Sequence, residues 1–388
     1  MYKPVLLNGG VNLDEKYMRQ ALEIAKYAIG RTSPNPMVGA IVVRDSRVVG
    51  QGWHRQAGSP HAEINALQQA GTLAQGATMY VTLEPCSHYG RTPPCADTLI
   101  SAGIKKVVVA MNDPNPLVAG KGLKKLREVG IEVVEGVLSV EAAILNEIFI
   151  KYISTQMPFV VLKSAISLDG KIAAYTGHSQ WITGQESREY VHELRDCYDA
   201  ILVGIGTVLV DNPSLTTRLP HKGKNPIRII IDSRARTPLD AHVVTDGLAQ
   251  TIIAVTHKAP QDRVNALRAC GAEVVVINEK QSGVDLRQLF NTLAMRNITS
   301  ILIEGGGNIN ASVLDENLVD KIYWFIAPKI IGGQSARGPV GGQGVADVNK
   351  AHMLEDMNIE HIGQDILISA YMRNREGRDV YRDCGRIR

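Results

Sequence analysis

The sequence has few aromatic residues and no long apolar run. Aromatic residues make up 5% of the 388 positions and only 4 are phenylalanine, which predicts a core built mostly of aliphatic side chains. The most apolar stretches, such as 200–210, are interrupted by glycine, whereas a membrane-spanning helix needs about 20 consecutive apolar residues. Residues 1–11 contain no apolar run of the kind that a secretory signal requires. The sequence therefore predicts no membrane partner.

Cysteine is also scarce. The chain has 5 cysteines, at positions 86, 95, 197, 270 and 384, and this odd, sparse set does not suit a disulfide framework. Free thiols persist in a reducing compartment, so we expect a cytoplasmic protein.

An excess of charge of one sign is missing as well. The 42 basic and 39 acidic residues leave a net charge of +3, and no Lys/Arg-rich stripe marks a nucleic-acid surface. With 45% hydrophobic and 21% charged residues, the composition is that of an ordinary globular protein. We expect small-molecule substrates, no nucleic-acid partner and a homo-oligomer.

The apolar patterns alternate between strand and helix, which predicts an α/β fold in two domains. Met157-Pro158 interrupts the alternation, so we expect a first domain over residues 10–156 and a second over 157–388. In the first domain the patterns predict helices over 14–29, 59–70, 94–102, 123–129 and 140–152, and strands over 39–43, 48–50, 78–83, 106–110 and 131–134. In the second they predict strands over 159–165, 200–204, 227–232, 251–255, 273–277, 300–303 and 321–326, and helices over 185–195, 263–268, 284–295 and 308–316.

The strongest chemical signal is His61-Ala62-Glu63, followed by Cys86 and Cys95. One imidazole and two thiolates are ligands that tetrahedral zinc takes, and three protein ligands leave the fourth position for water, as in catalytic sites. Glu63 is two residues from His61, so it can stand beside the metal without binding it. There it could take a proton from the zinc-bound water and deliver it to a leaving amine. Zinc deaminases carry this arrangement as H-x-E followed by P-C-x-x-C.

The spacing departs from that signature, because Cys86 and Cys95 are nine positions apart. Two other interpretations therefore stay open. One is a closed structural zinc site, with His54 or His88 as the fourth ligand. The other is a pair of unrelated buried cysteines.

The long inter-cysteine segment and three other motifs resemble the bifunctional deaminase/reductase family of riboflavin biosynthesis. The resemblance rests on Ser33–Gly39, His61–Glu63, Thr82–Cys95, and Asp113-Pro114-Asn115-Pro116 with Gly120 and Gly122. It implies a cytidine-deaminase-like three-layer domain followed by a domain similar to dihydrofolate reductase. It further implies zinc on His61, Cys86 and Cys95, with Glu63 as the proton carrier. The implied first reaction is hydrolytic removal of the 2-amino group of 2,5-diamino-6-(5-phosphoribosylamino)pyrimidin-4(3H)-one. His88 and Arg91 lie between the cysteines, either contacting a phosphate or ribose or forming a solvated loop.

Without the resemblance, the second half gives weaker signals. Gly204-Ile205-Gly206 begins like a dinucleotide-binding fingerprint, but Leu209 replaces the third glycine and the later acidic residue is Asp232 at best, so we reject that interpretation. Glu304-Gly305-Gly306-Gly307-Asn308 lies between an expected strand and an expected helix, which suits a phosphate. A glycine-rich turn without a ligand stays open there.

The resemblance implies that this half uses NADPH to reduce the ribosyl chain to ribityl, giving 5-amino-6-(5-phosphoribitylamino)uracil. By position, the cofactor-binding residues are Ala165, Trp181, Thr207, Asp211, Ser233, Gly306, Gly307, Asn308, Ile309, Asn310, Ala311 and Ser312. The substrate-binding residues are Ser179, Arg195, Leu215, Arg218 and Glu304. Asp211 is a candidate for orientation or proton handling. Taken singly, Trp181 could be core, His192 structural, and each arginine a surface ion pair.

Two other functions are compatible with part of the pattern. The first is a deaminase acting on a base in RNA or DNA, with the second half as a targeting domain. The second is a zinc-stabilised nucleotide-binding module without turnover. The balanced charge argues against the first, and the presence of Glu63 argues against the second.

Overall fold

The computed structural model describes residues 12–87, 93–115, 118–220, 223–281 and 283–373. The described residues form two compact units, 12–154 and 155–373. None of the helices within these ranges has the length and hydropathy needed to cross a membrane.

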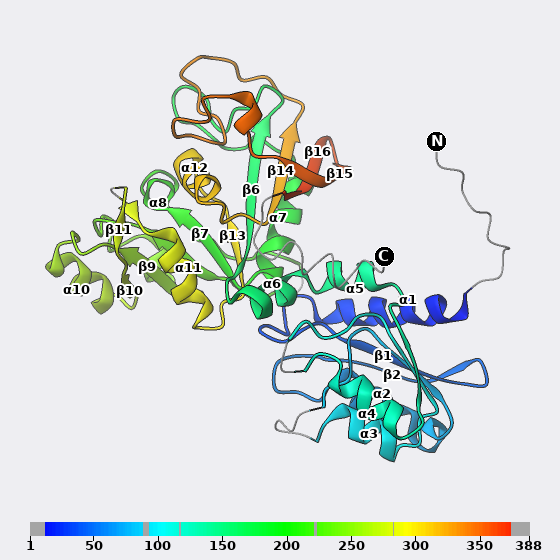
Figure 1. Cartoon of the computed structure of the whole chain (residues 1–388). Helices are drawn as coiled ribbons and strands as arrows, with labels where there is room; N and C mark the ends of the chain where they lie inside the picture. The colour runs from blue at the N-terminus through cyan, green and yellow to red at the C-terminus, as the bar shows by residue number, and fades with distance from the viewer. Residues whose placement is uncertain (1–11, 88–92, 116–117, 221–222, 282, 374–388) are drawn as a thin grey trace. The chain divides into compact units, whose positions relative to one another are not determined.

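The first unit is a five-stranded sheet between two helical layers (Figure 1). Its strands are β1 (Gly39–Arg44), β2 (Arg47–Trp53), β3 (Thr78–Val81), β4 (Lys106–Val109) and β5 (Glu132–Glu135), in the order β2-β1-β3-β4-β5. Its helices are α1 (Leu13–Ala25), α2 (Ala62–Ala70), α3 (Cys95–Ser101), α4 (Lys121–Glu128), α5 (Ser139–Leu145) and α6 (Glu147–Thr155). β3, β4 and β5 are parallel, whereas β1 is antiparallel to both of its neighbours. Helices α1 and α5 lie on one side of the sheet, and α2, α3 and α4 lie on the other.

Glycines let the two helical layers approach the sheet closely. A Cβ atom on Gly39 of β1 would lie 2.0 Å from the Ala21 carbonyl oxygen in α1. A Cβ atom on Gly52 of β2 would lie 2.5 Å from the Ala62 carbonyl oxygen in α2. Both contacts are too short for any side chain, so α2 is seated directly on the β2 backbone at its N-terminal end.

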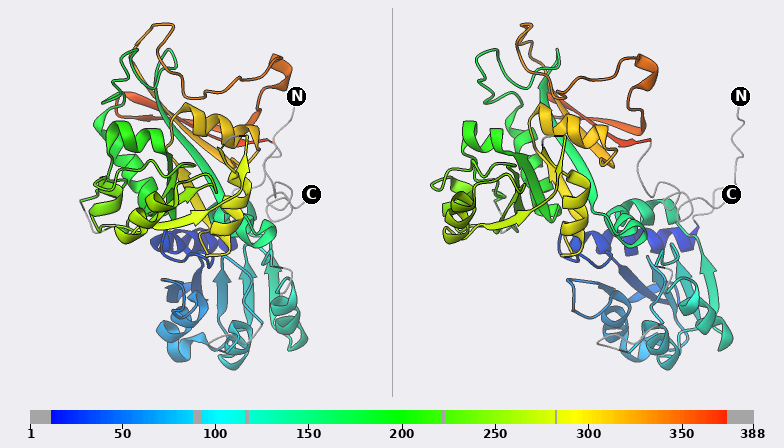
Figure 2. Two further views of the ribbon diagram at one scale, coloured as in Figure 1. Left: turned by 90° about the vertical axis from the view of Figure 1, so that its left-hand side faces the viewer. Right: turned by 60° about the vertical axis from the view of Figure 1, so that its left-hand side comes forward.

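The second unit contains a nine-stranded sheet, ordered β10-β9-β8-β7-β13-β6-β14-β16-β15 (Figure 2). Its strands are β6 (Phe159–Ser167), β7 (Ala200–Gly204), β8 (Ile227–Ile231), β9 (Thr251–Val255), β10 (Glu273–Val276), β13 (Ser300–Ile303), β14 (Lys321–Ala327), β15 (Leu354–Ile362) and β16 (Asp365–Met372). Neighbours from β10 to β14 are parallel, and the β15–β16 hairpin is antiparallel. The carboxyl ends of the parallel strands share one edge, where ligands of such sheets bind.

Helices cover both faces of this sheet. They are α7 (Gln185–Cys197), α8 (Ile205–Asp211), α9 (His242–Thr245), α10 (Gln261–Ala269), α11 (Leu286–Ala294) and α12 (Gly307–Asp315). Leu202 of β7 packs in the apolar core formed with α11 and α12, and the next residue, Val203, packs in the core formed with α8 and α10. This alternation is the pattern of a strand buried on both faces. A short hairpin of β11 (Glu279–Lys280) and β12 (Gly283–Val284), and 3₁₀ turns over Lys26–Ala28, Gly71–Ala74 and Val348–Lys350, complete the described elements.

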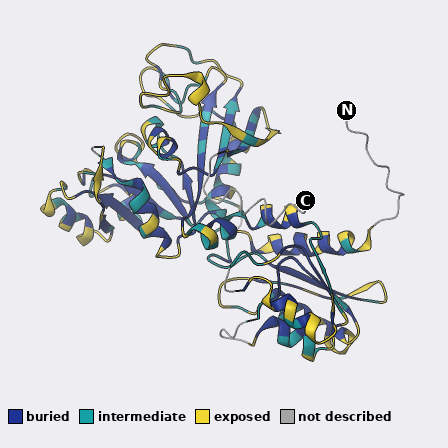
Figure 3. Ribbon diagram, viewed as in Figure 1, coloured by how far each residue is buried: buried dark blue, intermediate teal, exposed yellow. Residues whose placement is uncertain are grey.

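Three of the places where the structure differs from the sequence-based elements are informative. Helix α2 begins at Ala62 instead of Ser59, because His61 has an extended backbone and is the N-cap residue. Residues 205–211, which the glycine pattern left unassigned, form the short helix α8. The β15–β16 hairpin was not predicted at all. β15 is polar and mostly exposed (Figure 3), so it lacks the apolar alternation that identifies a half-buried strand.

Candidate functional site: a metal cluster and a charged sheet edge

The first unit gathers one histidine and two cysteines into a single cluster. Their three donor atoms, from His61, Cys86 and Cys95, all lie within 4.8 Å of one another. His61 Nδ1 is 3.2 Å from Cys95 Sγ and 3.7 Å from Cys86 Sγ. Tetrahedral zinc with bonds of about 2.0 to 2.3 Å holds its ligand atoms about 3.3 to 3.8 Å apart. The donor set and its spacing therefore fit zinc.

Local structure explains why these three side chains meet. His61 is the N-cap of α2, Cys86 follows β3, and Cys95 is the first residue of α3. The Cys95 backbone N–H donates to Cys86 Sγ at 3.3 Å. Hydrogen bonds from Cys95 and from His61 to its sulfur lower the pKa of Cys86 well below its ordinary value, although burial opposes this shift. A thiolate is the form of cysteine that binds a metal.

Glu63 is the carboxylate beside this cluster. It lies in the first turn of α2 and is 3% exposed. Burial raises its pKa above the ordinary value, and the neighbouring His61 opposes that shift. A carboxyl group with a raised pKa next to a metal centre is suited to accept and return a proton near neutral pH.

His54 does not belong to the ligand set. Its Nδ1 is 3.2 Å from the Pro60 carbonyl oxygen and its Nε2 is 3.1 Å from Asn35 Nδ2, so both ring nitrogens have other partners. Its ring packs edge to face against His61, with centroids 5.4 Å apart. Of the two fourth ligands considered from the sequence, His54 is thus excluded by geometry, and His88 lies outside the described residues together with Arg91.

Glu84 is a residue of this site that the sequence analysis did not single out. Its buried carboxylate accepts hydrogen bonds from the backbone N–H groups of Gly120 (2.9 Å) and Gly122 (3.0 Å), at the start of α4. A Cβ atom on Gly122 would lie 2.0 Å from the Pro85 carbonyl oxygen. Glu84 and Gly122 therefore fix the backbone just before Cys86. The only available signal was the position of Glu84 two residues before a metal ligand.

In the second unit, partly buried charges gather where β13 ends, beside the middle of β6. Arg195 of α7 donates from Nε and Nη2 to the two carboxylate oxygens of Glu304, at 2.7 and 3.0 Å. Lys163 Nζ of β6 lies 3.8 Å from the same carboxylate. Burial opposes ionisation of Glu304, but the charges of Arg195 and Lys163 outweigh it and lower the pKa of Glu304 to about 2. Lys163 was not among the predicted site residues, because a lysine inside an apolar strand carries no motif.

The turn after β13 contains Gly305, Gly306 and Gly307. Lack of space for a side chain explains Gly305 and Gly307, whereas Gly306 lies at an open helix start. A Cβ atom on Gly305 would lie 3.0 Å from Ile309 Cβ, and one on Gly307 would lie 3.1 Å from the Gly338 carbonyl oxygen. At Gly306, by contrast, a Cβ atom would meet no atom within 4 Å, and φ is −78°, which any residue can adopt. Gly306 is the N-cap of α12 and makes no side-chain cap, so backbone N–H groups at this helix start are available to an anion.

Comparison with known proteins identifies the family. Residues 158–368 match the family model described as RibD C-terminal domain, and residues 11–111 match the cytidine and deoxycytidylate deaminase zinc-binding region. The riboflavin biosynthesis protein RibD of Actinobacillus pleuropneumoniae is 44% identical over 355 residues, covering 92% of this chain and 94% of that protein. The chain belongs to the RibD family.

Solved structures agree with this assignment. Acinetobacter baumannii RibD has a TM-score of 0.84 at 40% identity, covering 94% of this chain and all of that one. A diaminohydroxyphosphoribosylaminopyrimidine deaminase/5-amino-6-(5-phosphoribosylamino)uracil reductase from Thermotoga maritima has a TM-score of 0.82 at 39% identity, covering 93% and 99%. The predicted family and two-domain α/β fold are confirmed.

RibD proteins are bifunctional enzymes of riboflavin biosynthesis, with a zinc deaminase domain and a reductase domain that uses NADPH. Both domains are present in this chain, so the predicted enzyme class and cofactors are confirmed. A nucleic-acid deaminase with a targeting domain is not supported, because the second half matches the RibD C-terminal domain.

The topology brings many of the predicted RibD reductase residues to one sheet edge. Ala165 is near the end of β6, Thr207 and Asp211 lie on α8 after β7, and Ser233 follows β8. Asp211 is an exposed residue at the end of α8. Neighbouring atoms still remove part of the water around its carboxyl group, which raises its pKa. Asp232 is fully buried and accepts two hydrogen bonds from Thr237, so it shapes a turn.

The predicted residues of α12 divide into two groups. Asn308 and Ser312 are exposed and Ile309 is half-buried. Asn310 and Ala311 are buried, and Asn310 Nδ2 donates to the Pro339 carbonyl oxygen at 2.7 Å. The Asn310 side chain therefore attaches the backbone at Pro339 to α12.

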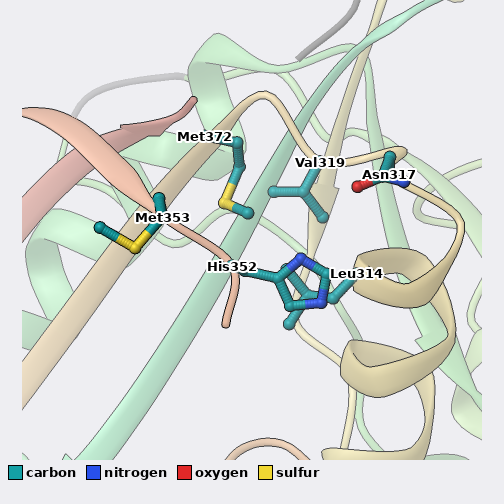
Figure 4. Close-up of a pocket in the computed structure, with 6 residues that line it drawn as sticks. All are labelled: Leu314, Asn317, Val319, His352, Met353 and Met372. Atoms are coloured by element: carbon teal, nitrogen blue, oxygen red, sulfur yellow. The ribbon is translucent and has the colours of Figure 1, made fainter. Parts of the chain in front are cut away.

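Two predicted residues lie in the segment after β6. Trp181 is 61% exposed, so it is not a core residue, and the Arg188 guanidinium lies 5.0 Å from its ring centroid. Ser179 is half-buried nearby in the sequence. A small pocket elsewhere in the unit (Figure 4) contains none of the predicted residues, and we assign it no ligand; it is lined by Leu314, Asn317, Val319, His352, Met353 and Met372.

Proposed function

We propose that the first domain, residues 10–156, hydrolyses 2,5-diamino-6-(5-phosphoribosylamino)pyrimidin-4(3H)-one to 5-amino-6-(5-phosphoribosylamino)uracil. The second domain, residues 157–388, then reduces the ribosyl chain with NADPH to give 5-amino-6-(5-phosphoribitylamino)uracil. The observation that carries this proposal is the cluster of His61, Cys86 and Cys95 beside the buried carboxyl of Glu63. The T. maritima relative, whose name states the same two reactions, supports the choice of substrate.

His61, Cys86 and Cys95 would hold zinc in the deamination step. When bound, zinc acts as a Lewis acid and lowers the pKa of water to near 7. Glu63 accepts a proton from the attacking water and delivers it to the amino nitrogen at C2. The C–N bond then breaks, ammonia leaves, and a carbonyl group replaces the amine. Burial of Glu63 raises its pKa, which favours acceptance of the proton from water.

The reduction step needs one hydride and one proton. When bound, NADPH would supply the hydride to C1′ of the ribose. Overall, the C1′–O bond of the ribose ring is replaced by a C1′–H bond and an O–H bond, so the conversion also takes up one proton. Lys163 is the buried cation beside Glu304, and burial lowers its pKa, which favours release of a proton. We therefore propose that Lys163, and not the exposed Asp211, donates this proton.

The substrate shell would comprise Ser179, Arg195, Leu215, Arg218 and Glu304. The cofactor shell would comprise Ala165, Trp181, Thr207, Asp211, Ser233 and residues 306–312, with the open backbone at Gly306 suited to a phosphate of NADPH. These side chains mainly align hydride donor and acceptor, since the nicotinamide supplies the redox chemistry.

A cytoplasmic homo-oligomer fits these features. Thiolate ligands require a reducing compartment. The edge strand β15 leaves Met357 60% and Ile359 57% exposed, which supports a second copy of the chain packing there. Sedimentation at several protein concentrations, with Ile359→Lys as the comparison, tests the assembly, and a monomer for both proteins contradicts it.

The activity is tested by supplying the diaminopyrimidine phosphate with and without NADPH. We expect ammonia release in both cases and loss of NADPH absorbance only when the substrate is present. The deaminated intermediate supplied alone should consume NADPH without releasing ammonia. No ammonia from the diaminopyrimidine, or ammonia from an RNA oligonucleotide instead, would overturn the proposal.

A further inference from the structure

Residues 213–218 form a bend that is attached to one face of α7. The Thr216 carbonyl oxygen accepts a hydrogen bond from Arg195 Nη1 at 3.0 Å. The Arg218 backbone N–H donates to His192 Nδ1 at 3.3 Å. His192 and Arg195 are three positions apart on α7, so they lie on the same face of the helix.

This bend contains a backbone conformation that needs such support. Leu215 is 4% exposed and has φ of +52°, in the left-handed region that a leucine rarely adopts. A residue held there costs free energy, and it persists only when the surrounding structure fixes it. The contacts from α7 to Thr216 and Arg218 lie directly after Leu215, so they hold the bend in this conformation.

His192 is in the right protonation state to accept this hydrogen bond. Burial, and then the charges of Arg195 and Arg218, lower its pKa to about 4, against smaller opposing effects of Glu304 and of a hydrogen bond with the Thr216 backbone. The imidazole is therefore neutral at physiological pH, and one ring nitrogen keeps its lone pair.

The two arginines near His192 differ in their freedom to bind an anion. The guanidinium of Arg195 is committed to Glu304 and to Thr216. Arg218 is exposed, and its guanidinium forms no ion pair within the described parts of the chain. Its backbone, by contrast, is held by His192.

We propose that His192 is a positioning residue of the reduction step, which fixes the bend 213–218 so that Arg218 meets the phosphate of the substrate. The proposal rests on the proposed reduction of a phosphorylated sugar chain. In this role His192 acts on substrate binding through the Arg218 backbone, to which it is hydrogen-bonded.

The test compares His192→Phe, which keeps a ring but removes the acceptor, with His192→Asn, whose Oδ1 can accept in place of Nδ1. For the phosphorylated aminouracil, His192→Phe should raise KM about tenfold, the usual effect of one lost hydrogen bond. Its kcat should stay within about twofold, because hydride alignment is untouched, and His192→Asn should restore most of the KM. For the same aminouracil without its phosphate, the three proteins should have equal KM.

Arg218→Ala provides the second comparison. If His192 acts through Arg218, adding His192→Phe to Arg218→Ala should change KM no further. The proposal would be overturned if the KM of the double variant rose by the product of the two single rises. It would also be overturned if His192→Phe raised KM equally for the substrate without phosphate. A fall in kcat at unchanged KM would overturn it too.

The deamination step of the same polypeptide is the internal control for folding. Ammonia release by His192→Phe should equal that of the unsubstituted chain, since His192 lies in the other unit. If the unsubstituted chain did not oxidise NADPH with the aminouracil phosphate, the proposed function itself would fail, and this result differs from every outcome above.

Discussion

The two units build their sites in different ways. In the first, the three candidate metal ligands lie between residues 61 and 95, and each is a residue type that commonly binds zinc. In the second, the charged cluster joins Lys163, Arg195 and Glu304. Lys163 and Glu304 become neighbours because β6 and β13 pair in the sheet, and Arg195 reaches them from α7. A candidate zinc site can therefore be recognised as a local motif, whereas the charged cluster of the second unit is formed by the topology of the sheet.

The substitution Glu63→Gln should distinguish the activities of the two units most clearly. A neutral amide cannot carry a proton, so ammonia release should fall by a factor on the order of 10³. Zinc content should stay the same, because Glu63 is not in the ligand set. NADPH oxidation with the deaminated intermediate should also be unchanged. Ammonia release within tenfold of the unsubstituted rate would remove Glu63 from the mechanism.

Glu304→Gln examines the corresponding carboxylate of the second unit through stability. It leaves Arg195 and Lys163 buried without their counter-charge, so it should lower the free energy of unfolding by about 3 kcal/mol at pH 7. Because the pKa of Glu304 is about 2 in the folded state and 4.5 is its ordinary value, the ion pair stabilises fully above about pH 4.5. This stabilisation is lost as the pH falls from 4.5 towards 2.

Urea unfolding at pH 7 and at pH 3 measures this difference directly. The difference in the free energy of unfolding between the variant and the unsubstituted chain should be large at pH 7 and clearly smaller at pH 3. A gap of the same size at both values would show that the carboxylate charge of Glu304 does not stabilise the fold.

The smallest expected effect concerns two adjacent glycines. Gly306→Ala adds a Cβ atom where the protein leaves space, so the melting temperature should stay unchanged while the KM for NADPH rises about tenfold. Gly305→Ala is the matched control, because its Cβ would press on Ile309 and should lower the melting temperature. An unchanged KM for Gly306→Ala would mean that no phosphate binds at this turn.

The sequence was sufficient for the His/Cys/Cys cluster that could hold a metal and for the strands buried on both faces, because donor chemistry and apolar patterning are local properties. It was insufficient where function depends on three-dimensional neighbours. Lys163 looks like one polar interruption in an apolar strand, and only the pairing of β6 with β13 places it beside Glu304. Glu84 is similar, since its partners at Gly120 and Gly122 are brought to it by the fold. The polar strand β15 has no apolar period to detect.

The zinc coordination shell tests the account most directly. X-ray absorption at the zinc edge, combined with metal analysis of the purified chain, counts the ligands and measures their distances. We predict one zinc ion per chain, with two sulfur neighbours at about 2.3 Å, one imidazole nitrogen at about 2.0 Å and one oxygen from water. A chain that holds no zinc, or a shell with a fourth protein ligand in place of water, would contradict the account.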